Sequence, residues 1–460
     1  MPASHALDRI SVSADDASLV SDAGLVLPAT LAGRLGLAEL LDAQVSAGAN
    51  AADKCLTVIH SALAGGDCID DVDALRAGAS AAVLGHRVAA ASTVGTFLRQ
   101  MSWGHARQLD AVTRRLLARA AAAGALELAP TEGRPVVVDI DATLVETYGL
   151  AKSGAREVMR TGRRGYHPLL AVLAGTGDVV HARLRRGRSN DATGAGSFVA
   201  ETLARLANAG ARGPLVLRAD SGFYLAEVLE ACRRRGAGFS IGARMIGRMR
   251  ATIAALPETA WTPLPYFEPG AAVTELTWTV FDQHRRRDND PWRGLGHRVR
   301  LIVRRTPTPP GIRARAEAAA GQQALFPTFE YHPFITDQPG DPLTLDVFHR
   351  AHAEVELAIR DLKHGLGLNH LPSGHFGANQ TWLLLQTIAH NLGRWTARLG
   401  GLAATARQTI KTLRRRYLTV PARLTRHARR VRLRLPTGWP WAQALITALT
   451  RLRALPAPAT

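Results

Sequence analysis

Apolar positions follow two different periods along the chain. Before about residue 130 they recur at helical spacing, as in LAGRLGLAELLDAQV and HARQLDAVTRRLLARAAAAG, which predicts a helical N-terminal domain over residues 1–130. From Pro135 onward, short runs of β-branched residues take over, beginning with PVVVDIDATLV. We therefore expect a helical domain followed by an α/β core.

One stretch of the N-terminal region, STVGTFLRQMSWGHARQLDAV, predicts two short helices around a turn. This is the outline of a helix-turn-helix, which would bind DNA. An ordinary helical bundle used for packing or dimerisation has the same outline. We expect residues 1–130 to serve DNA binding or dimerisation, and the pattern leaves both open.

Elements of the core alternate in a recognisable order. The predicted strands and helices are strands at 135–145, 165–175 and 178–187, a helix at 190–210 that Asn190 or Asp191 can cap, a strand at 213–220, a helix at 221–236 and a strand at 237–244. This β-β-β-α-β-α-β order predicts a mixed sheet covered by helices.

The rhythm breaks between residues 245 and 345, where TELTWTVF, HRVRLIVRR and FEYHPFIT lie among prolines and polar connections. We interpret this stretch as an inserted, mostly β subdomain of a catalytic domain that spans residues 131–395. Helical spacing returns at 344–364 and 379–399. We expect the last part, residues 396–460, to be an Arg-rich helical tail.

The charge balance is strongly basic. The 460 residues include 57 Lys+Arg against 38 Asp+Glu, a formal net charge of +19, and only four of the cations are Lys. Residues 401–435 alone hold 11 Lys+Arg and no acid. An excess of this size indicates a polyanionic partner, and double-stranded DNA is the first candidate.

Cysteine usage and hydropathy exclude other classes. The three Cys, with no CxxC, cannot form a disulfide framework or a typical zinc site. The polar, acidic start MPASHALDRISVSADD is unlike a signal peptide, and no apolar run of about 18 residues would span a membrane. We expect a cytoplasmic protein with no membrane partner.

Three acidic positions carry candidate chemistry. Asp139 and Asp141 lie two apart in a predicted strand, so their side chains share one face. Asp220 ends the strand PLVLRAD, and ligands of α/β sheets bind at the carboxyl ends of strands. The third acid, Glu356, lies in the helix predicted over 344–364.

On a wheel at about 100° per residue, five polar side chains of this helix share a stripe: His349, His352, Glu356, Arg360 and Lys363. Glu354 falls on the opposite flank. A carboxylate among cations suits a site for metal and phosphate, although an exposed helix with i,i+4 salt pairs gives the same pattern. Three carboxylates from two strands and a helix match a ribonuclease-H-like fold with a two-metal site.

Several segments together resemble the DDE transposases of bacterial insertion sequences, most closely insertion sequence family 1380. They are VVVDIDATLVE, GYHPLLAVLAGTGDVVHARLRRGRSND, LVLRADSGF and FHRAHAEVELAIRDLKHGLGLNHLPSGHFGANQTWLLLQTIAHNL, within about residues 135–395. The wider group carries Tyr-x2-Arg-x3-Glu-x6-Lys around its third acid. Here Glu356 and Lys363 match, while His349 and His352 stand at the Tyr and Arg positions.

The resemblance implies that Asp141, Asp220 and Glu356 bind two Mg²⁺, which Mn²⁺ can replace. Asp139 stays a rival for the first catalytic acid. The implied activity is cleavage at the terminal inverted repeats and strand transfer into target DNA, by a homodimer on paired ends. Predicted DNA contacts are His349, His352, Arg360 and Lys363 near the acids, Arg285, Arg286 and Trp292 in the β insertion, and Arg414, Arg415 and Arg416 in the tail.

Two other functions compete. Asp139-x-Asp141-x-Thr143 after an apolar strand is the nucleophile motif of haloacid-dehalogenase-like phosphatases. Those enzymes need a cation, usually Lys, at a helix start between their motifs, and no Lys lies between Lys152 and Lys363. The other candidate is a transposase-derived DNA-binding protein that has lost its chemistry.

Overall fold

A mixed sheet of nine strands organises the middle of the molecule. The computed structural model describes residues 7–128, 134–158, 162–281, 296–312, 315, 328–403, 408–428 and 430–457. Within them the sheet has the order β10-β11-β12-β13-β9-β8-β2-β6-β7. Its strands are β2 (Val136–Ala142), β6 (Leu169–Leu173), β7 (Val179–Arg183), β8 (Leu215–Ala219), β9 (Gly238–Gly242), β10 (Thr262–Pro263), β11 (Ala272–Val280), β12 (His297–Pro307) and β13 (Phe329–Thr336).

Strand β2 is the centre of this sheet. It pairs antiparallel with β6, which pairs antiparallel with β7, and on its other side it pairs parallel with β8, which is parallel to β9. Its apolar residues Val136, Val138 and Ile140 are buried, so the apolar run that predicted the strand is the run that fills the core. All five predicted core strands are confirmed, with shorter bounds.

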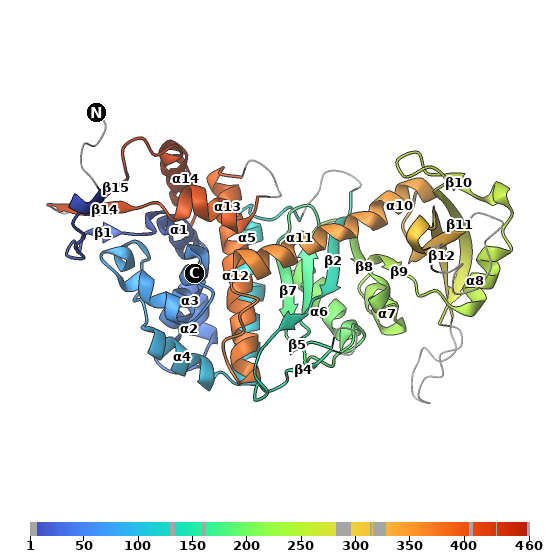
Figure 1. The fold of residues 1–460 in the computed structure, drawn as a ribbon, viewed down its shortest axis with the longest axis horizontal. Coiled ribbons are helices and arrows are strands. Elements are labelled where there is room, and N and C mark those ends of the chain that lie inside the picture. The colour runs from blue at the N-terminus through green and yellow to red at the C-terminus, as the bar shows by residue number, and fades with distance from the viewer. Residues whose placement is uncertain are drawn as a thin grey trace.

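The inserted strands extend the same sheet. β13 pairs antiparallel with β9, and β12, β11 and β10 follow in antiparallel order. They carry a small apolar core of their own, formed by Leu264, Ala271, Val273, Ile302, Phe334 and Leu345. Helix α8 (Gly247–Ala254) lies beside them (Figure 1). The predicted strands of this region are confirmed.

Helices cover both faces of the sheet. The ring of His181 on β7 stacks on Phe198 of α6 (Ala195–Asn208) at 4.1 Å between centroids, and α6 packs on α7 (Ala226–Arg234). Because strand residues alternate, the pairings Asp141↔Leu170 and Leu170↔Ala182 put Asp141 on the face opposite to His181. That second face carries α11 (Val355–Arg360), which contacts β2 and β6.

Helix α12 (Phe376–Gly400) connects the sheet to the N-terminal helices. It packs on the edge strand β7 and on α1 (Val26–Arg34), α3 (Ala51–Ala64), α4 (Ala91–Gln100), α5 (Trp103–Ala122) and α14 (Ala442–Ala454). Asn391 accepts from the Val179 N–H and donates to the Val179 carbonyl, both at 2.8 Å. A buried amide therefore satisfies both backbone groups of Val179 at the edge of the sheet, where they would otherwise be open to pairing.

The N-terminal region is helical, as predicted, and also includes α2 (Leu37–Gln44). α4 and α5 are the two helices expected around a turn, and Ser102 caps α5 by accepting from the His105 N–H. No single helix within the described ranges is long and apolar enough to cross a membrane. The bent pair 23–34 and 37–44 passes that test of length and composition only when taken together.

The C-terminal segment differs from the helical tail that we predicted. After α13 (Ile410–Leu413), strands β14 (Ala422–His427) and β15 (Arg430–Arg434) form a hairpin, and α14 follows. β14 also pairs with β1 (Leu19–Val20), so residues from both ends of the chain form one small sheet (Figure 1). The alternating pattern ARLTRH favours a strand, and its pairing partner is hundreds of residues away in the sequence.

Candidate active site

Asp141 and Asp220 lie side by side at the carboxyl ends of two paired strands. β2 and β8 are parallel, and their last paired residues are Ile140 and Ala219, so each acid follows directly on its strand's last pair. Asp220 accepts from the Gly222 N–H at 3.0 Å and thereby caps a short 3₁₀ turn, Ser221–Phe223. Asp141 accepts from the Ala142 N–H at 2.7 Å. The predicted pair of strand-end acids is thus brought together at one edge.

The surroundings of Asp141 disfavour its negative charge. The pKa of Asp141 is raised to about 6, chiefly by burial and also by the charges of Asp220 and Asp191, while the Ala142 N–H and His352 act in the opposite direction. Asp141 therefore shares its site with two other carboxylates. A cation placed among them would relieve both the repulsion and the desolvation.

Asp139, two residues earlier on the same face, has a different environment. It is 1 % exposed, and both of its oxygens accept from Arg218, at 2.8 Å from Nε and 2.9 Å from Nη2. His352 Nδ1 lies 3.0 Å from Asp139 Oδ1. Arg218 also donates to the Phe348 carbonyl at 2.6 Å. Asp139 is thus closed off in a buried ion pair that ties β2 and β8 to the helix above them.

The helix predicted over 344–364 is composed of four pieces. These are α10 (Pro342–Arg350), a 3₁₀ turn at Ala351–Glu354, α11 and a π-helical turn at Asp361–Gly365. It is fixed to the sheet at Asp139 through His352 and at the Leu144 carbonyl, which accepts from Lys363 Nζ at 2.7 Å. Glu356 is exposed and lies one helical turn after His352, between these two anchors.

Glu354 lies on a different flank of the helix. It lines a cavity of about 230 Å³ together with Asp139, Gly175, Asp361 and Thr409, on the side of β6. Arg360, which we predicted to share the stripe of Glu356, also lines this cavity and is exposed. Arg360 and Glu354 thus line one cavity, although we predicted them on opposite flanks.

His349 does not lie on the surface that was predicted for it. Its ring stacks on Phe334 at 4.2 Å, and its Nδ1 lies 2.9 Å from Ser240 Oγ. Burial lowers the pKa of His349 to about 3. His352 also points to the sheet, at Asp139, so this part of the stripe that we predicted to contact DNA faces the protein itself. The prediction of His349 as a DNA contact is wrong, because the side chain is used in the core.

Lys363 is partly withdrawn from solvent. Burial lowers its pKa, and Glu146 and Asp141 counteract that effect. One of its three N–H donors holds the Leu144 carbonyl. Lys363 therefore positions the helix against the extension of β2, close to the charge of Asp141.

The remaining predicted DNA contacts differ from one another in their surroundings. Arg285, Arg286 and Trp292 lie outside the described residues. Arg414 is turned inward: it donates to the carbonyls of Leu63, Ala62 and Gly365 and so caps the end of α3, which corrects its prediction as a DNA contact. Arg415 and Arg416 are exposed, with Arg416 over the Trp441 ring at 5.9 Å.

Asp191 is a site residue that the sequence analysis missed. We predicted that Asn190 or Asp191 caps the following helix, but α6 begins at Ala195 after Gly194, and Asn190 accepts from the Thr193 N–H at 3.0 Å. Asp191 instead lies against the turn after Asp220, since a β-carbon on Gly222 would lie 2.6 Å from Asp191 Oδ2. No spacing rule connects Asp191 to Asp220, and only the fold brings them together.

Arg185 holds the loop that carries Asp191. Its Nη1 donates to the carbonyls of Asn190, Asp191 and Thr193 at 2.7, 3.3 and 3.1 Å, and its Nε donates to the His167 carbonyl at 2.8 Å. His167 Nε2 lies 3.7 Å from Asp191 Oδ1. A buried guanidinium thus fixes the fourth carboxylate beside the strand-end acids.

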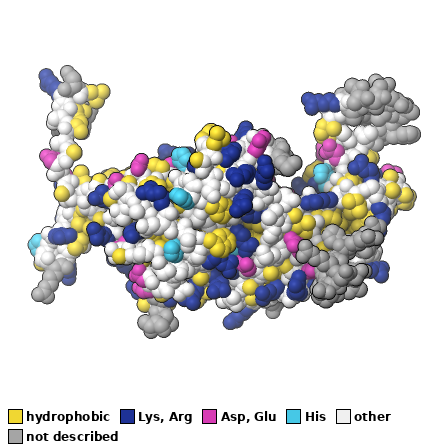
Figure 2. All heavy atoms as spheres, turned by 90° about the horizontal axis from the view of Figure 1, so that it is seen from below, with side chains coloured by type: hydrophobic (Ala, Val, Ile, Leu, Met, Phe, Trp, Pro, Cys, Tyr) yellow, Lys and Arg dark blue, Asp and Glu magenta, His cyan; other side chains and the backbone are white. Residues whose placement is uncertain are grey.

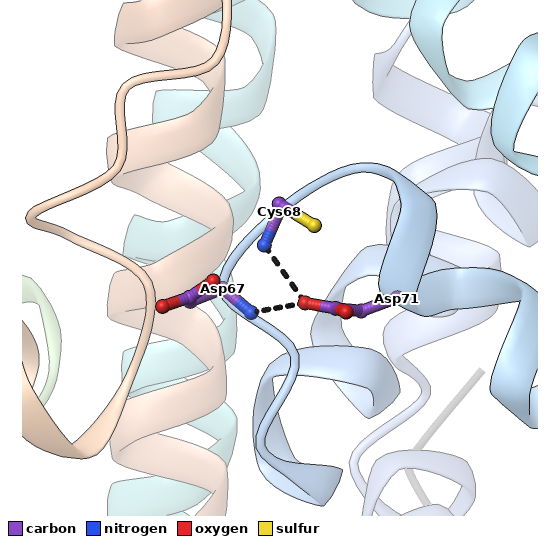
Figure 3. A group of neighbouring side chains, drawn as sticks. All are labelled: Asp67, Cys68 and Asp71. Carbon is purple, nitrogen blue, oxygen red and sulfur yellow. Dashed lines mark hydrogen bonds between the residues drawn. The ribbon is translucent and has the colours of Figure 1, made fainter.

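Two compact clusters of potential metal ligands occur among the described residues, and the three predicted acids do not form a third with all ligand atoms within 4.8 Å. In the first, Asp71 Oδ2 accepts from the N–H groups of Asp67 and Cys68 at 2.8 and 3.0 Å (Figure 3). That carboxylate closes a turn.

The second cluster joins Asp110, His181 and Glu201. Asp110 is ion-paired with Arg205, and Glu201 with Arg183 at 2.8 Å. Its carboxylates are already neutralised by guanidinium groups, so a divalent ion would add positive charge to an arginine-rich neighbourhood. Neither cluster suits a catalytic metal better than the strand-end acids.

Comparison with known families decides the classification. The family model described as transposase DDE domain group 1 matches residues 4–457. The chain belongs to this transposase family. The match includes the N-terminal helices and the C-terminal hairpin as well as the sheet.

None of the curated proteins matches the chain. Among solved structures, the chain is similar to the piggyBac transposase synaptic complex with hairpin DNA. The two share 9 % identity over 86 % of this chain and 79 % of that chain, with a TM-score of 0.42. At that TM-score the likeness carries no weight for the assignment of residues, which rests on the geometry above.

Proposed function

We propose that this chain is a DNA transposase that cuts the ends of an insertion sequence and joins them to target DNA. The observation that carries the proposal is the meeting of Asp141 and Asp220 at the ends of β2 and β8. We assign Glu356, which is exposed on the helix that contacts β2 and β6, as the third acid. In a chain of the transposase DDE family, these three acids are the best-supported catalytic set.

The sheet supports a ribonuclease-H-like core. The five strands of this core have the order β7-β6-β2-β8-β9, with three antiparallel strands followed by two parallel ones. Two helices cover one face and α11 covers the other. Such a core presents its acids at the carboxyl ends of the central strands, where a phosphodiester can approach from solvent.

The acids fit a divalent metal. Carboxylate oxygens are the ligands that Mg²⁺ prefers, and Mn²⁺ accepts the same set. The raised pKa of Asp141 beside Asp220 and Asp191 shows that added positive charge would be favourable at this site. Asp141, Asp220 and Glu356 would hold two Mg²⁺, which when bound activate the attacking hydroxyl and stabilise the leaving oxygen.

The other side chains position this set. The Asp139–Arg218–His352 contacts fix the helix that carries Glu356, and Lys363 fixes its far end. Arg360 is exposed on that helix and is available to the phosphate backbone. Double-stranded DNA is the expected substrate, and we further propose that residues 1–130 contact the terminal repeats and that two copies act on paired ends.

A phosphatase of the haloacid dehalogenase type is disfavoured by the position of Asp139. That residue would be its nucleophile, yet it is buried and both of its oxygens are bound by Arg218. A nucleophile must reach its substrate and carry a free lone pair. A DNA-binding protein without chemistry is the second candidate, and the experiment below separates it from the enzyme.

The test is metal-dependent cleavage of DNA that contains the segments flanking the coding sequence of this chain. The unaltered protein is compared with Asp220→Asn and Glu356→Gln in Mg²⁺, in Mn²⁺ and in EDTA. We expect cleavage with either metal, none in EDTA, and loss of cleavage in both variants while DNA binding persists. Binding without cleavage under every metal would support the non-catalytic candidate instead.

A further inference from the structure

The hairpin β14–β15 has two chemically different faces. Its register pairs Arg423 with Arg434, Thr425 with Arg432, and His427 with Arg430. Paired residues project to the same side, and residues two apart along a strand do as well. One face therefore carries four Arg, one His and one Thr, which we call the arginine face: Arg423, Thr425, His427, Arg430, Arg432 and Arg434. The reverse face carries Leu424, Arg426, Val431 and Leu433.

The reverse face fastens the hairpin to the molecule. Leu424 and Leu433 are paired with each other and pack against the main apolar core. β1 pairs with β14 on its outer edge, and the Leu424 N–H donates to the Ser18 carbonyl at 2.8 Å. The hairpin is therefore held in place at its base, and its arginine face is turned to solvent, with all four Arg exposed.

Repulsion between the paired arginines lowers the stability of the hairpin, and packing of the hairpin gives no reason for placing them there. Like charges directly across a strand pair destabilise it, and here Arg423 faces Arg434. Asp16 pairs with Arg423 at 2.9 Å, whereas Arg430, Arg432 and Arg434 form no ion pair with any described residue. The strands and their turn contain no acid. A surface of this kind is complementary to a polyanion.

We propose that the arginine face of β14–β15 is a β-ribbon that binds double-stranded DNA, in addition to the contacts at the catalytic acids. A two-stranded ribbon fits the major groove, and the Arg guanidinium binds phosphates or a guanine edge through two parallel N–H bonds. In Figure 1 the ribbon lies at one end of the molecule, and β2 and β8 lie in its middle. The ribbon would therefore hold duplex away from the cleavage point.

Basic residues on other surfaces are not arranged in the same way as those of the arginine face. Figure 2 shows Lys and Arg side chains along much of the face it draws, without a single concentrated patch. Those side chains would contribute a diffuse attraction. The ribbon differs because its cations are arranged on one side of a two-stranded element. Arg426 lies on the other side of the same hairpin and therefore serves as an internal control.

The proposal rests on the proposed function, because it takes DNA as the substrate, and the experiment keeps the two apart. The full chain with Glu356→Gln, which should bind without cutting, is titrated against a fluorescein-labelled mixed-sequence duplex at several salt concentrations. Arg432→Ala removes a cation from the arginine face, and Arg426→Ala removes one from the reverse face of the same hairpin.

We expect Arg432→Ala to weaken binding by about 3- to 10-fold and to lower the slope of log K against log salt by about one, because one phosphate contact is lost. Arg426→Ala should change affinity by less than about twofold. The triple variant Arg430→Ala, Arg432→Ala, Arg434→Ala should lower the slope by about three. Melting temperatures without DNA serve as the folding control, and removal of like charges should not lower them.

Equal effects of Arg432→Ala and Arg426→Ala would overturn the ribbon. So would unchanged binding by the triple variant while the intact protein still binds and cuts DNA, and in that case the proposed function would stand. If the unaltered protein bound no duplex at any salt concentration, both the ribbon and the transposase function would fail. The affinity measurement thus tells the two failures apart.

Discussion

Asp139 and Asp141 share one face of one strand and yet occupy two different kinds of environment. The carboxylate of Asp139 is buried and is bound by Arg218 and His352. The charged groups that act on Asp141 instead include two further carboxylates, those of Asp220 and Asp191. The difference arises from the cross-strand neighbour, since Arg218 lies opposite Asp139 on β8. Spacing alone puts two acids on a face, and the neighbouring strand decides what each can do.

Substitution of the proposed metal-binding acids should have the largest effect, a loss of DNA cleavage. Asp220→Asn and Glu356→Gln should each lower the rate of cleavage by more than about a hundredfold, because even the partners of metal ligands typically contribute 10- to 100-fold. Glu354→Gln is the matched control on the neighbouring flank and should retain cleavage within about threefold. A plasmid-nicking assay in Mg²⁺ measures all three. Equal losses in the two Glu variants would contradict the choice of Glu356.

Substitution in the buried Asp139–Arg218 ion pair should change the stability of the protein. Asp139→Ala leaves Arg218 charged and buried without its partner, which should lower the free energy of unfolding by about 3–5 kcal/mol. Urea denaturation followed by circular dichroism measures this loss. The double variant Asp139→Leu, Arg218→Met removes both charges and should recover much of it. No recovery in the double variant would show that the ion pair is not the cause.

The pH dependence of stability separates the two acids further. The folded-state pKa of Asp141 is raised to about 6 from 3.8. Between these values the folded state binds more protons than the unfolded state, so stability falls as pH rises from about 4 to 6 and stays lower above. Asp141→Asn removes this dependence and should stabilise the protein at pH 8 by on the order of 2 kcal/mol. Melting temperatures from pH 4 to pH 8 in EDTA test this sign.

The smallest effect concerns His349. Because its ring is stacked in the core and its pKa is lowered to about 3, it is neutral and hidden from DNA at pH 7. His349→Gln should therefore leave the salt dependence of DNA binding unchanged and cost about 1 kcal/mol of stability through its contact with Ser240. Fluorescence anisotropy and urea denaturation give the two values. A slope reduced by one would restore His349 as a phosphate contact.

Sequence patterns predicted the core strands and the strand-end position of Asp220, because both depend on local periodicity. They failed for His349, because helical spacing shows which side chains share a face and not whether the sheet covers that face. They also failed for the hairpin β14–β15, because β14 pairs with Leu19–Val20 near the other end of the chain.

Asp191 and Arg414 were missed or misassigned for a related reason. Asp191 approaches Asp220 only because Arg185 folds its loop back over the sheet. Arg414 finds its acceptors on α3, about 350 residues earlier. Contacts between segments this far apart leave no signal in local spacing, so the acids could be predicted and their surroundings could not.

Direct binding of Mn²⁺, followed by electron paramagnetic resonance, tests the metal assignment most directly. The unaltered protein is compared with Asp141→Asn and Asp139→Asn at pH 8, which is above the pKa of about 6 for Asp141. The assignment predicts that Asp141→Asn loses the bound Mn²⁺ signal and that Asp139→Asn retains it in the fraction that is folded. Retention of Mn²⁺ by Asp141→Asn together with its loss from folded Asp139→Asn would exchange the roles of the two acids and contradict the proposed site.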